Sequence, residues 1–182
     1  TTEIYTLSLH DALPILLGNE LLTEEFVQEG IVLDNEFPEV VVVGFDTTLT
    51  YEKMCRVCDF VREGLPYLST HPDYNCPTET GFIPDAGAIH AFIRASAGSE
   101  PDHNIGKPNR DIMDYLVARE GADKARTAMV GDRLYTDVAA GVNNGYTGIL
   151  VLSGEATMED VKISDVEPDL IFDSVKDMIP FL

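Results

Sequence analysis

Two aspartates and one lysine are the residues of this chain whose types and spacing favour chemistry. Asp132 follows an apolar run at residues 127–130, and Asp137 lies five residues further along. Lys107 stands between a glycine and a proline in a separate segment. A carboxylate pair at the carboxyl end of a strand suits a divalent cation, and a lysine nearby suits a phosphate group. Together the three residues predict a site for a metal ion and a phosphorylated ligand.

The two aspartates have different expected roles. Ligands of an open parallel sheet bind beyond the carboxyl ends of its strands, so Asp132 would point into that crevice, and Gly131 before it allows a tight turn. Mg²⁺ is bound by one or two carboxylates and keeps several waters, which makes Asp132 the expected direct ligand. Asp137 would lie in the first turn of the next helix, where the dipole favours an anion. We expect Asp137 to complete the metal site or to orient Lys107.

Alternating strands and helices are predicted around these residues. Apolar periodicity predicts strands at 40–43, 65–69, 127–130, 147–152 and 169–172. It predicts helices at 21–29, 51–62, 85–97, 109–120, 136–144 and 174–181, with Thr23 and Thr50 as N-caps of the first two. Residues 71–84 are predicted to form a long loop. The alternation indicates an α/β fold with a parallel sheet and right-handed crossovers.

Composition divides the chain into three parts. The sequence starts without Met, and residues 1–15 do not match the remainder of the chain, so we expect a non-native segment at the end of a truncated gene. A break at residues 98–101 separates one predicted domain at 16–99 from another at 100–182.

Charge and cysteine content limit the partners. The net charge of −20 over 182 residues disfavours nucleic acid and anionic membranes as partners. No apolar run approaches the roughly 20 residues that span a bilayer. Three cysteines are too few for a disulfide framework, which favours the cytoplasm.

A zinc site is the weaker alternative for the cysteines. Cys55 and Cys58 have C-x-x-C spacing, and His71 and Cys76 come later in the sequence. The apolar residues around the pair recur at helical spacing, however, which favours packing of the cysteines as small apolar side chains.

Three motifs resemble those of a known family. They are Ile105-Gly-Lys-Pro-Asn109, Met129-Val-Gly-Asp-Arg-Leu-Tyr-Thr-Asp137 and Leu150-Val-Leu-Ser-Gly154. They resemble the haloacid dehalogenase (HAD) superfamily, and within it the NagD-like, p-nitrophenylphosphatase branch. Residues 41–53 and 75–78 resemble the cap of that branch. The resemblance implies the C-terminal half of a Rossmann-like parallel-sheet core at 100–182, preceded by an α/β C2-type cap at 16–99 through which the protein could form a homodimer.

The resemblance also implies an activity and residue roles. The family hydrolyses small phosphomonoesters, of the sugar-phosphate or nucleotide type, through an aspartyl-phosphate intermediate with Mg²⁺. Lys107 matches the motif that holds the phosphate, with Asn109 beside it for substrate binding. Asp132 matches the Mg²⁺ ligand and Asp137 its partner.

The first motif of the family, Asp-x-Asp-Gly-Thr, is not in the sequence, and neither is the second. We therefore expect this chain to be inactive alone. The alternative to a phosphatase is a non-catalytic fragment that acts only in self-association. Asp46, in Val43-Gly-Phe-Asp-Thr-Thr-Leu-Thr50, resembles a first motif, but it lacks the second carboxylate that acid–base catalysis needs.

Overall fold

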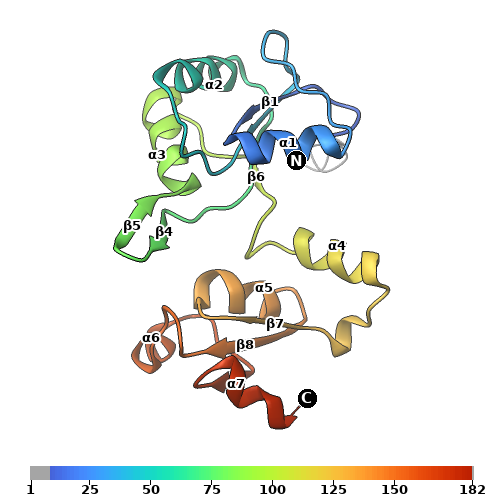
Figure 1. The fold of residues 1–182 in the computed structure, drawn as a ribbon, viewed down its shortest axis with the longest axis vertical. Coiled ribbons are helices and arrows are strands. Elements are labelled where there is room, and N and C mark those ends of the chain that lie inside the picture. Colours follow the sequence, from blue (N-terminus) through green and yellow to red (C-terminus); the bar gives the residue numbers. More distant parts are fainter. Residues whose placement is uncertain (1–8, 182) are drawn as a thin grey trace. The chain divides into compact units, whose positions relative to one another are not determined.

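The computed structural model describes residues 9–181, and these residues form two compact units (Figure 1). The first unit extends to Asn104 and the second begins at Ile105. The predicted break at residues 98–101 precedes strand β6 (His103–Asn104), which pairs with the sheet of the first unit. Among the described residues, no helix is long and apolar enough to cross a bilayer.

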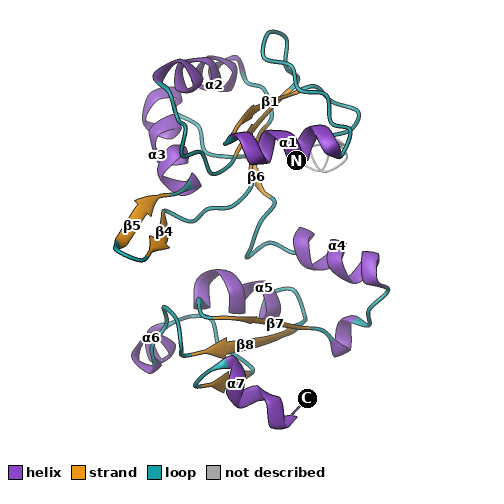
Figure 2. Ribbon diagram, viewed as in Figure 1, coloured by secondary structure: helices purple, strands orange, loops and turns teal. Residues whose placement is uncertain are grey.

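The first unit is built on a parallel sheet in the order β1-β2-β3-β6. Its other strands are β1 (Pro14–Leu17), β2 (Val40–Val43) and β3 (Tyr67–Ser69). Figure 2 draws the strands of the protein in orange. All four residues of β2 are fully buried, as predicted for a β-branched run covered on both faces.

The helices of this unit are α1 (Glu20–Gln28), α2 (Tyr51–Glu63) and α3 (Ala86–Ala97). Thr50 caps α2 as predicted, because its side chain accepts a hydrogen bond from the amide of Lys53. The predicted cap of the first helix, Thr23, is wrong. Asn19 caps α1 instead, one turn earlier, by accepting from Leu22.

The predicted loop at 71–84 contains a β-hairpin. Strand β4 (Asn75–Thr78) pairs antiparallel with β5 (Gly81–Pro84). Pro77 lies opposite Phe82 in this two-stranded ribbon. A proline is tolerated there because each strand has a free edge, whereas the same residue argues against a central strand. The hairpin was missed for that reason.

The start of the described chain is part of the first sheet. Pro14 and Ile15 pair with β2, and Ile15 and Ala12 are buried. The amide of Leu13 donates to the Glu39 carboxylate at 3.1 Å. Residues 12–15 are therefore packed into the first unit, residues 1–8 lie outside the described residues, and the non-native origin of residues 1–15 stays a prediction.

The second unit has a three-stranded parallel sheet in the order β7-β8-β9. The strands are β7 (Ala128–Gly131), β8 (Thr147–Val151) and β9 (Leu170–Phe172). The helices and helical turns are α4 (Asp111–Glu120), a 3₁₀ turn (Lys124–Arg126), a π-helical turn (Leu134–Val138), α5 (Ala139–Val142), α6 (Met158–Ile163), α7 (Val175–Met178) and a last 3₁₀ turn (Ile179–Phe181).

Alternate residues of the central strand β8 face two different clusters. Leu150 packs with Leu134 and Val138 of the segment after β7. Ile149 and Val151 pack on the opposite face with Met178. Helices therefore cover both faces of the sheet, as the α/β pattern predicts. Helix α6, only six residues long, was not predicted.

A buried histidine in the first unit is held in a chain of hydrogen bonds. Ser69 donates to the carbonyl of His71 at 3.0 Å, so it accepts from Nε2 of His90 at 2.7 Å. The Nδ1 atom of His90 then accepts from the hydroxyl of Tyr67. Burial, with a smaller contribution from the nearby charge of His71, lowers the pKa of His90 to about 4.

We predict that the first unit loses stability as the pH falls from about 6.5 toward 4. Unfolded His90 binds a proton near its ordinary pKa of 6.5, whereas the folded residue resists protonation until about pH 4. The loss is at most about 3 kcal/mol. Urea unfolding at pH 7.5 and pH 5 measures it, and the His90→Gln variant should lose less stability between these values. Equal losses in both proteins would contradict the assignment.

Candidate functional site

The structure brings Lys107 and Asp137 together in the second unit. The lysine Nζ lies 2.5 Å from Oδ1 of Asp137, across 30 residues of sequence. The side chain of Asp137 is 8% exposed, whereas that of the lysine is 37% exposed. Asp132 follows β7 directly, at the carboxyl end of that strand. This edge of a parallel sheet is where ligands of such folds bind.

A π-helical turn and one glycine position Asp137. The turn spans Leu134–Val138, where the sequence predicted an α-helix beginning at Thr136. It points Asp137 back at the strand, and the amide of Arg133 donates to its Oδ2 at 3.2 Å. A Cβ placed on Gly131 would collide with the side chain of Asp137. Only glycine at this position leaves room for the aspartate. Single π turns are frequent at functional sites.

The loop that carries Lys107 is fixed by one hydrogen bond within the loop and one from the segment after α5. The Lys107–Pro108 peptide bond is cis, and the amide of Asn109 donates to the carbonyl of Gly106 at 3.1 Å. The side chain of Asn144 donates to the carbonyl of Pro108 at 2.9 Å. The lysine therefore projects from a loop anchored to the end of α5. Asn109, predicted to bind substrate, lies in this loop, and its role stays a prediction.

Asp132 is held by the loop that comes after the neighbouring strand. Its Oδ2 accepts the amide of Glu155 at 2.8 Å, and its carbonyl accepts the amide of Ala156 at 3.0 Å. A Cβ on Gly154 would collide with the Asp132 carboxylate, which therefore rests against a bare backbone. Sequence reasoning did not assign a role to Gly154 or Glu155. The available signals were a glycine just after a predicted strand and the motif Leu150-Val-Leu-Ser-Gly154, which ends on that glycine.

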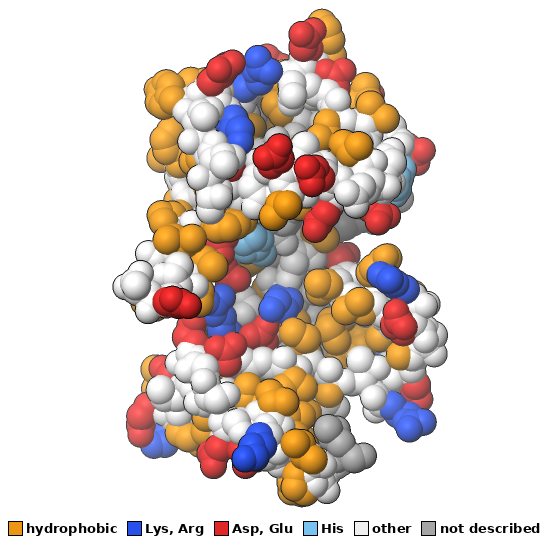
Figure 3. Space-filling view, viewed as in Figure 1, with side chains coloured by type: hydrophobic (Ala, Val, Ile, Leu, Met, Phe, Trp, Pro, Cys, Tyr) orange, Lys and Arg blue, Asp and Glu red, His pale blue; other side chains and the backbone are white. Residues whose placement is uncertain are grey.

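The chain as a whole is strongly acidic. Figure 3 shows Asp and Glu side chains, in red, spread over both units. The chain has 32 acidic and 12 basic residues, so an anionic ligand meets a repulsive field everywhere except near a local cation. Lys107 supplies such a charge at this sheet edge.

Asp46 in the first unit has a structural environment instead. Its Oδ1 accepts from the amide and hydroxyl of Thr48, each at 2.7 Å, and its Oδ2 lies 2.7 Å from Nζ of Lys53. The Asp46 side chain has no exposed surface, so no oxygen can reach a substrate. The carboxylate closes a turn and pairs with a lysine, which argues against a role as nucleophile.

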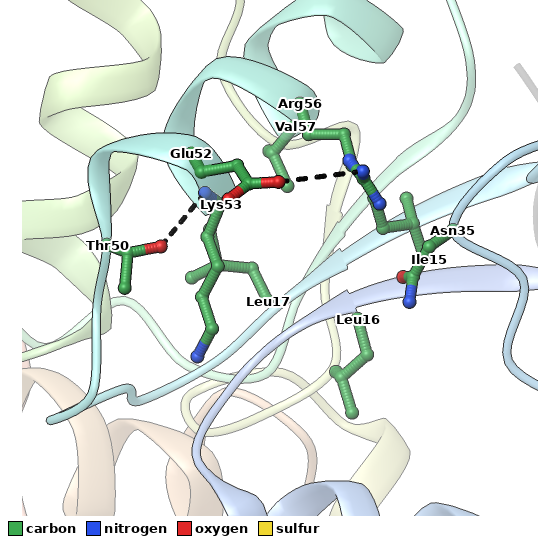
Figure 4. Close-up of a pocket in the computed structure, with 9 residues that line it drawn as sticks. All are labelled: Ile15, Leu16, Leu17, Asn35, Thr50, Glu52, Lys53, Arg56 and Val57. Carbon is green, nitrogen blue, oxygen red and sulfur yellow. Dashed lines mark hydrogen bonds and ion pairs between the residues drawn. The ribbon is translucent and has the colours of Figure 1, made fainter.

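A hollow of the first unit lies beside this pair, between β1 and α2. Figure 4 shows its lining, in which apolar residues of β1, such as Leu17, face Lys53 and Arg56 of α2. Arg56 is 3.8 Å from Glu52 on the same helix, and Lys53 is committed to Asp46. Both cations of the hollow are therefore already paired with carboxylates, and its wall from β1 is apolar.

The cysteines do not gather into a zinc site. Cys58 is buried in the core against β1 and β2, and Cys55 is exposed on α2. Across residues 9–181, no three His, Cys, Asp or Glu side chains form a ready-made metal cluster. The zinc alternative gains no support.

Comparisons with known proteins agree on one family. The HAD-hydrolase-like family model matches residues 104–178. An acid sugar phosphatase of Staphylococcus aureus is 38% identical over 165 residues, which cover 90% of this chain and 63% of the relative. The 4-nitrophenylphosphatase structure from Thermotoga maritima has 46% identity and a TM-score of 0.88, covering 93% of this chain and 65% of that one. The p-nitrophenyl phosphatase structure from Archaeoglobus fulgidus has 35% identity and a TM-score of 0.85, covering 94% and 67%. The chain thus spans about two thirds of the length of these proteins.

We predict that Gly131→Ala destabilises the second unit by about 2 kcal/mol or more, because the added methyl group overlaps Asp137. Gly121→Ala is the matched control. Gly121 has a left-handed φ of 62° but open space around it, so its substitution should cost only about 1 kcal/mol. Urea unfolding of both variants makes the comparison. Equal costs would mean that contact with Asp137 does not limit residue 131.

Proposed function

Because this chain belongs to the HAD superfamily, in its NagD-like, p-nitrophenylphosphatase branch, we propose that the whole protein hydrolyses small phosphomonoesters. The observation that carries the proposal is the contact of Lys107 with Asp137 beside Asp132, at the carboxyl end of β7. Relatives named as an acid sugar phosphatase and as p-nitrophenyl phosphatases support a small phosphorylated metabolite, of the sugar-phosphate or nucleotide type, as substrate.

Phosphatases of this family generally use a divalent metal, and we propose Mg²⁺ for this one. The described residues fit that ion. Mg²⁺ takes one or two carboxylates and retains waters, and Asp132 offers Oδ1 while its Oδ2 accepts the amide of Glu155. Both oxygens of Asp137 have partners in Lys107 and Arg133. We therefore assign Asp132 as the direct ligand, and Asp137 acts on the site through Lys107. When bound, Mg²⁺ would neutralise charge on the phosphate.

Lys107 would hold the phosphate group in this arrangement. Asp137 fixes its ammonium group, which carries three donors and would donate to a phosphate oxygen as well. A lysine held in place stabilises the charge that develops on phosphoryl oxygens during transfer, and it needs no reorganisation when the reaction occurs. In a chain with net charge −20 it also offsets the repulsion that a phosphorylated substrate meets.

The nucleophile of the proposed reaction lies outside these 182 residues. In the proposed route an aspartate carboxylate attacks phosphorus, the substrate alkoxide leaves, and water then cleaves the aspartyl phosphate. The sequence has no Asp-x-Asp-Gly-Thr motif to supply this carboxylate, and Asp46 is buried in a turn. The chain alone should therefore not turn over substrate. Cap-mediated dimerisation and a cytoplasmic location stay predictions.

We predict that a protein in which this chain is joined to an in-frame segment carrying Asp-x-Asp-Gly-Thr hydrolyses p-nitrophenyl phosphate with Mg²⁺. Asp132→Asn and Lys107→Met should each lower kcat/KM by about 10³-fold, since each removes charge stabilisation at the phosphate. Lys162→Met is the matched control. Lys162 pairs with Glu159 on the surface of α6, and its loss should leave the rate within twofold.

Full hydrolysis of p-nitrophenyl phosphate by the Asp132→Asn variant would contradict the proposed function. Steady-state kinetics of the 182-residue chain provide a second test. Mg²⁺-dependent turnover by that chain, lost in Asp46→Asn, would move the nucleophile to Asp46 and contradict its assignment to a segment outside these residues.

A further inference from the structure

We propose that the ion pair between Arg133 and Glu155 is a brace that orients the Asp132 carboxylate for its cation. This inference rests on the proposed function, because it concerns the ligand of the same metal. Arg133 and Glu155 are positioning residues, since neither is required to touch the substrate or the ion. They lie 22 residues apart, one after β7 and one after β8.

The brace acts through a backbone amide. The N–H of Glu155 donates to Oδ2 of Asp132 at 2.8 Å, and Gly154 leaves room for the carboxylate to lie against the chain. One carboxylate oxygen is thereby fixed, and Oδ1 is left as the oxygen that turns toward a cation. A hydrogen bond to a metal-binding carboxylate sets its orientation and tunes its affinity.

The loop that supplies this amide needs an anchor. Residues 153–155 are exposed, so they have little packing of their own to hold them. Arg133 provides the anchor, with its Nε 2.7 Å from Oε2 of Glu155. The hydroxyl of Tyr135 adds a longer contact of 3.4 Å to Oε1. Both carboxylate oxygens of Glu155 are thus held by residues that come after β7.

The burial and contacts of Arg133 favour a fixed conformation of its side chain. Its side chain is only 16% exposed, whereas that of Glu155 is 47% exposed, so water screens the ion pair mainly from the glutamate side. The backbone amide of Arg133 also donates to Asp137 at 3.2 Å. One residue therefore connects both aspartates of the site: its main chain contacts Asp137, and its side chain holds the loop that binds Asp132.

The test measures Mg²⁺ affinity and loop order in the 182-residue chain by NMR. Because the net charge of −20 attracts Mg²⁺ loosely over the whole surface, the titration is read at the amides of Asp132, Gly154 and Glu155, at constant ionic strength. Hydrogen exchange of the Glu155 amide is measured without metal. Arg133→Ala and Glu155→Ala should each weaken Mg²⁺ binding by about 10-fold and speed that exchange by about 10-fold.

The double variant should be little worse than either single one, because both substitutions break the same contact. Glu159→Gln is the control. It removes one charge from an exposed pair with Lys162 on α6 and should change neither quantity. The dispersion of the amide spectrum shows whether each variant remains folded.

The Asp132→Asn variant distinguishes a failure of the brace from a failure of the proposed metal ligand. If it abolishes Mg²⁺ binding while Arg133→Ala and Glu155→Ala leave affinity and exchange within twofold of wild type, the brace is overturned and the proposed function stands. If Asp132→Asn binds Mg²⁺ at these amides as tightly as wild type does, the metal assignment fails and the inference fails with it. If the effects of Arg133→Ala and Glu155→Ala on Mg²⁺ affinity add in the double variant, the two residues do not act through one contact, and the brace is also overturned.

Discussion

The ion pair of Lys107 with Asp137 is the interaction on which the rest of the site depends. It connects the loop before α4 to the π-helical turn after β7, two segments 30 residues apart. Gly131 allows the aspartate to reach its position, and Asn144 fixes the loop of the lysine. A buried carboxylate without its lysine would be costly, which makes the pair a constraint on the surrounding fold as well as a feature of the site.

The two units allow a structural ion pair to be compared with the ion pair of the proposed site. Each has a buried aspartate after a parallel strand, paired with a lysine: Asp46 with Lys53 at 2.7 Å, and Asp137 with Lys107 at 2.5 Å. In the first unit the carboxylate only closes a turn. In the second, Asp132 lies beside the pair and keeps partial exposure, so a cation and an anion can be held near each other. In the proposed function the units therefore differ by the partly exposed Asp132, because a buried aspartate paired with a lysine is common to both.

Much of this arrangement can be predicted from sequence, and the parts that cannot have physical reasons. The apolar run at 127–130 locates Asp132 at the end of β7, because strand ends leave local signals, whereas the roles of Asp132 and Lys107 stay predictions. The β4–β5 hairpin was missed since its proline is typical of loops, and α6 is too short for apolar periodicity to detect. Glu155 contacts Asp132 only because β7 and β8 pair in one particular register, with Gly131 opposite Leu150. Such a contact between distant segments depends on tertiary structure, which no local pattern encodes.

A double-mutant cycle on the unfolding free energy tests the central pair most directly. It compares Lys107→Met, Asp137→Asn and the double variant with wild type by urea unfolding of the second unit's transition. Because Asp137 is 6% exposed, we predict a coupling energy of about 1–2 kcal/mol, above the range of surface pairs. A coupling below about 0.3 kcal/mol would place the pair among solvated surface contacts. It would contradict the claim that this interaction holds the site together.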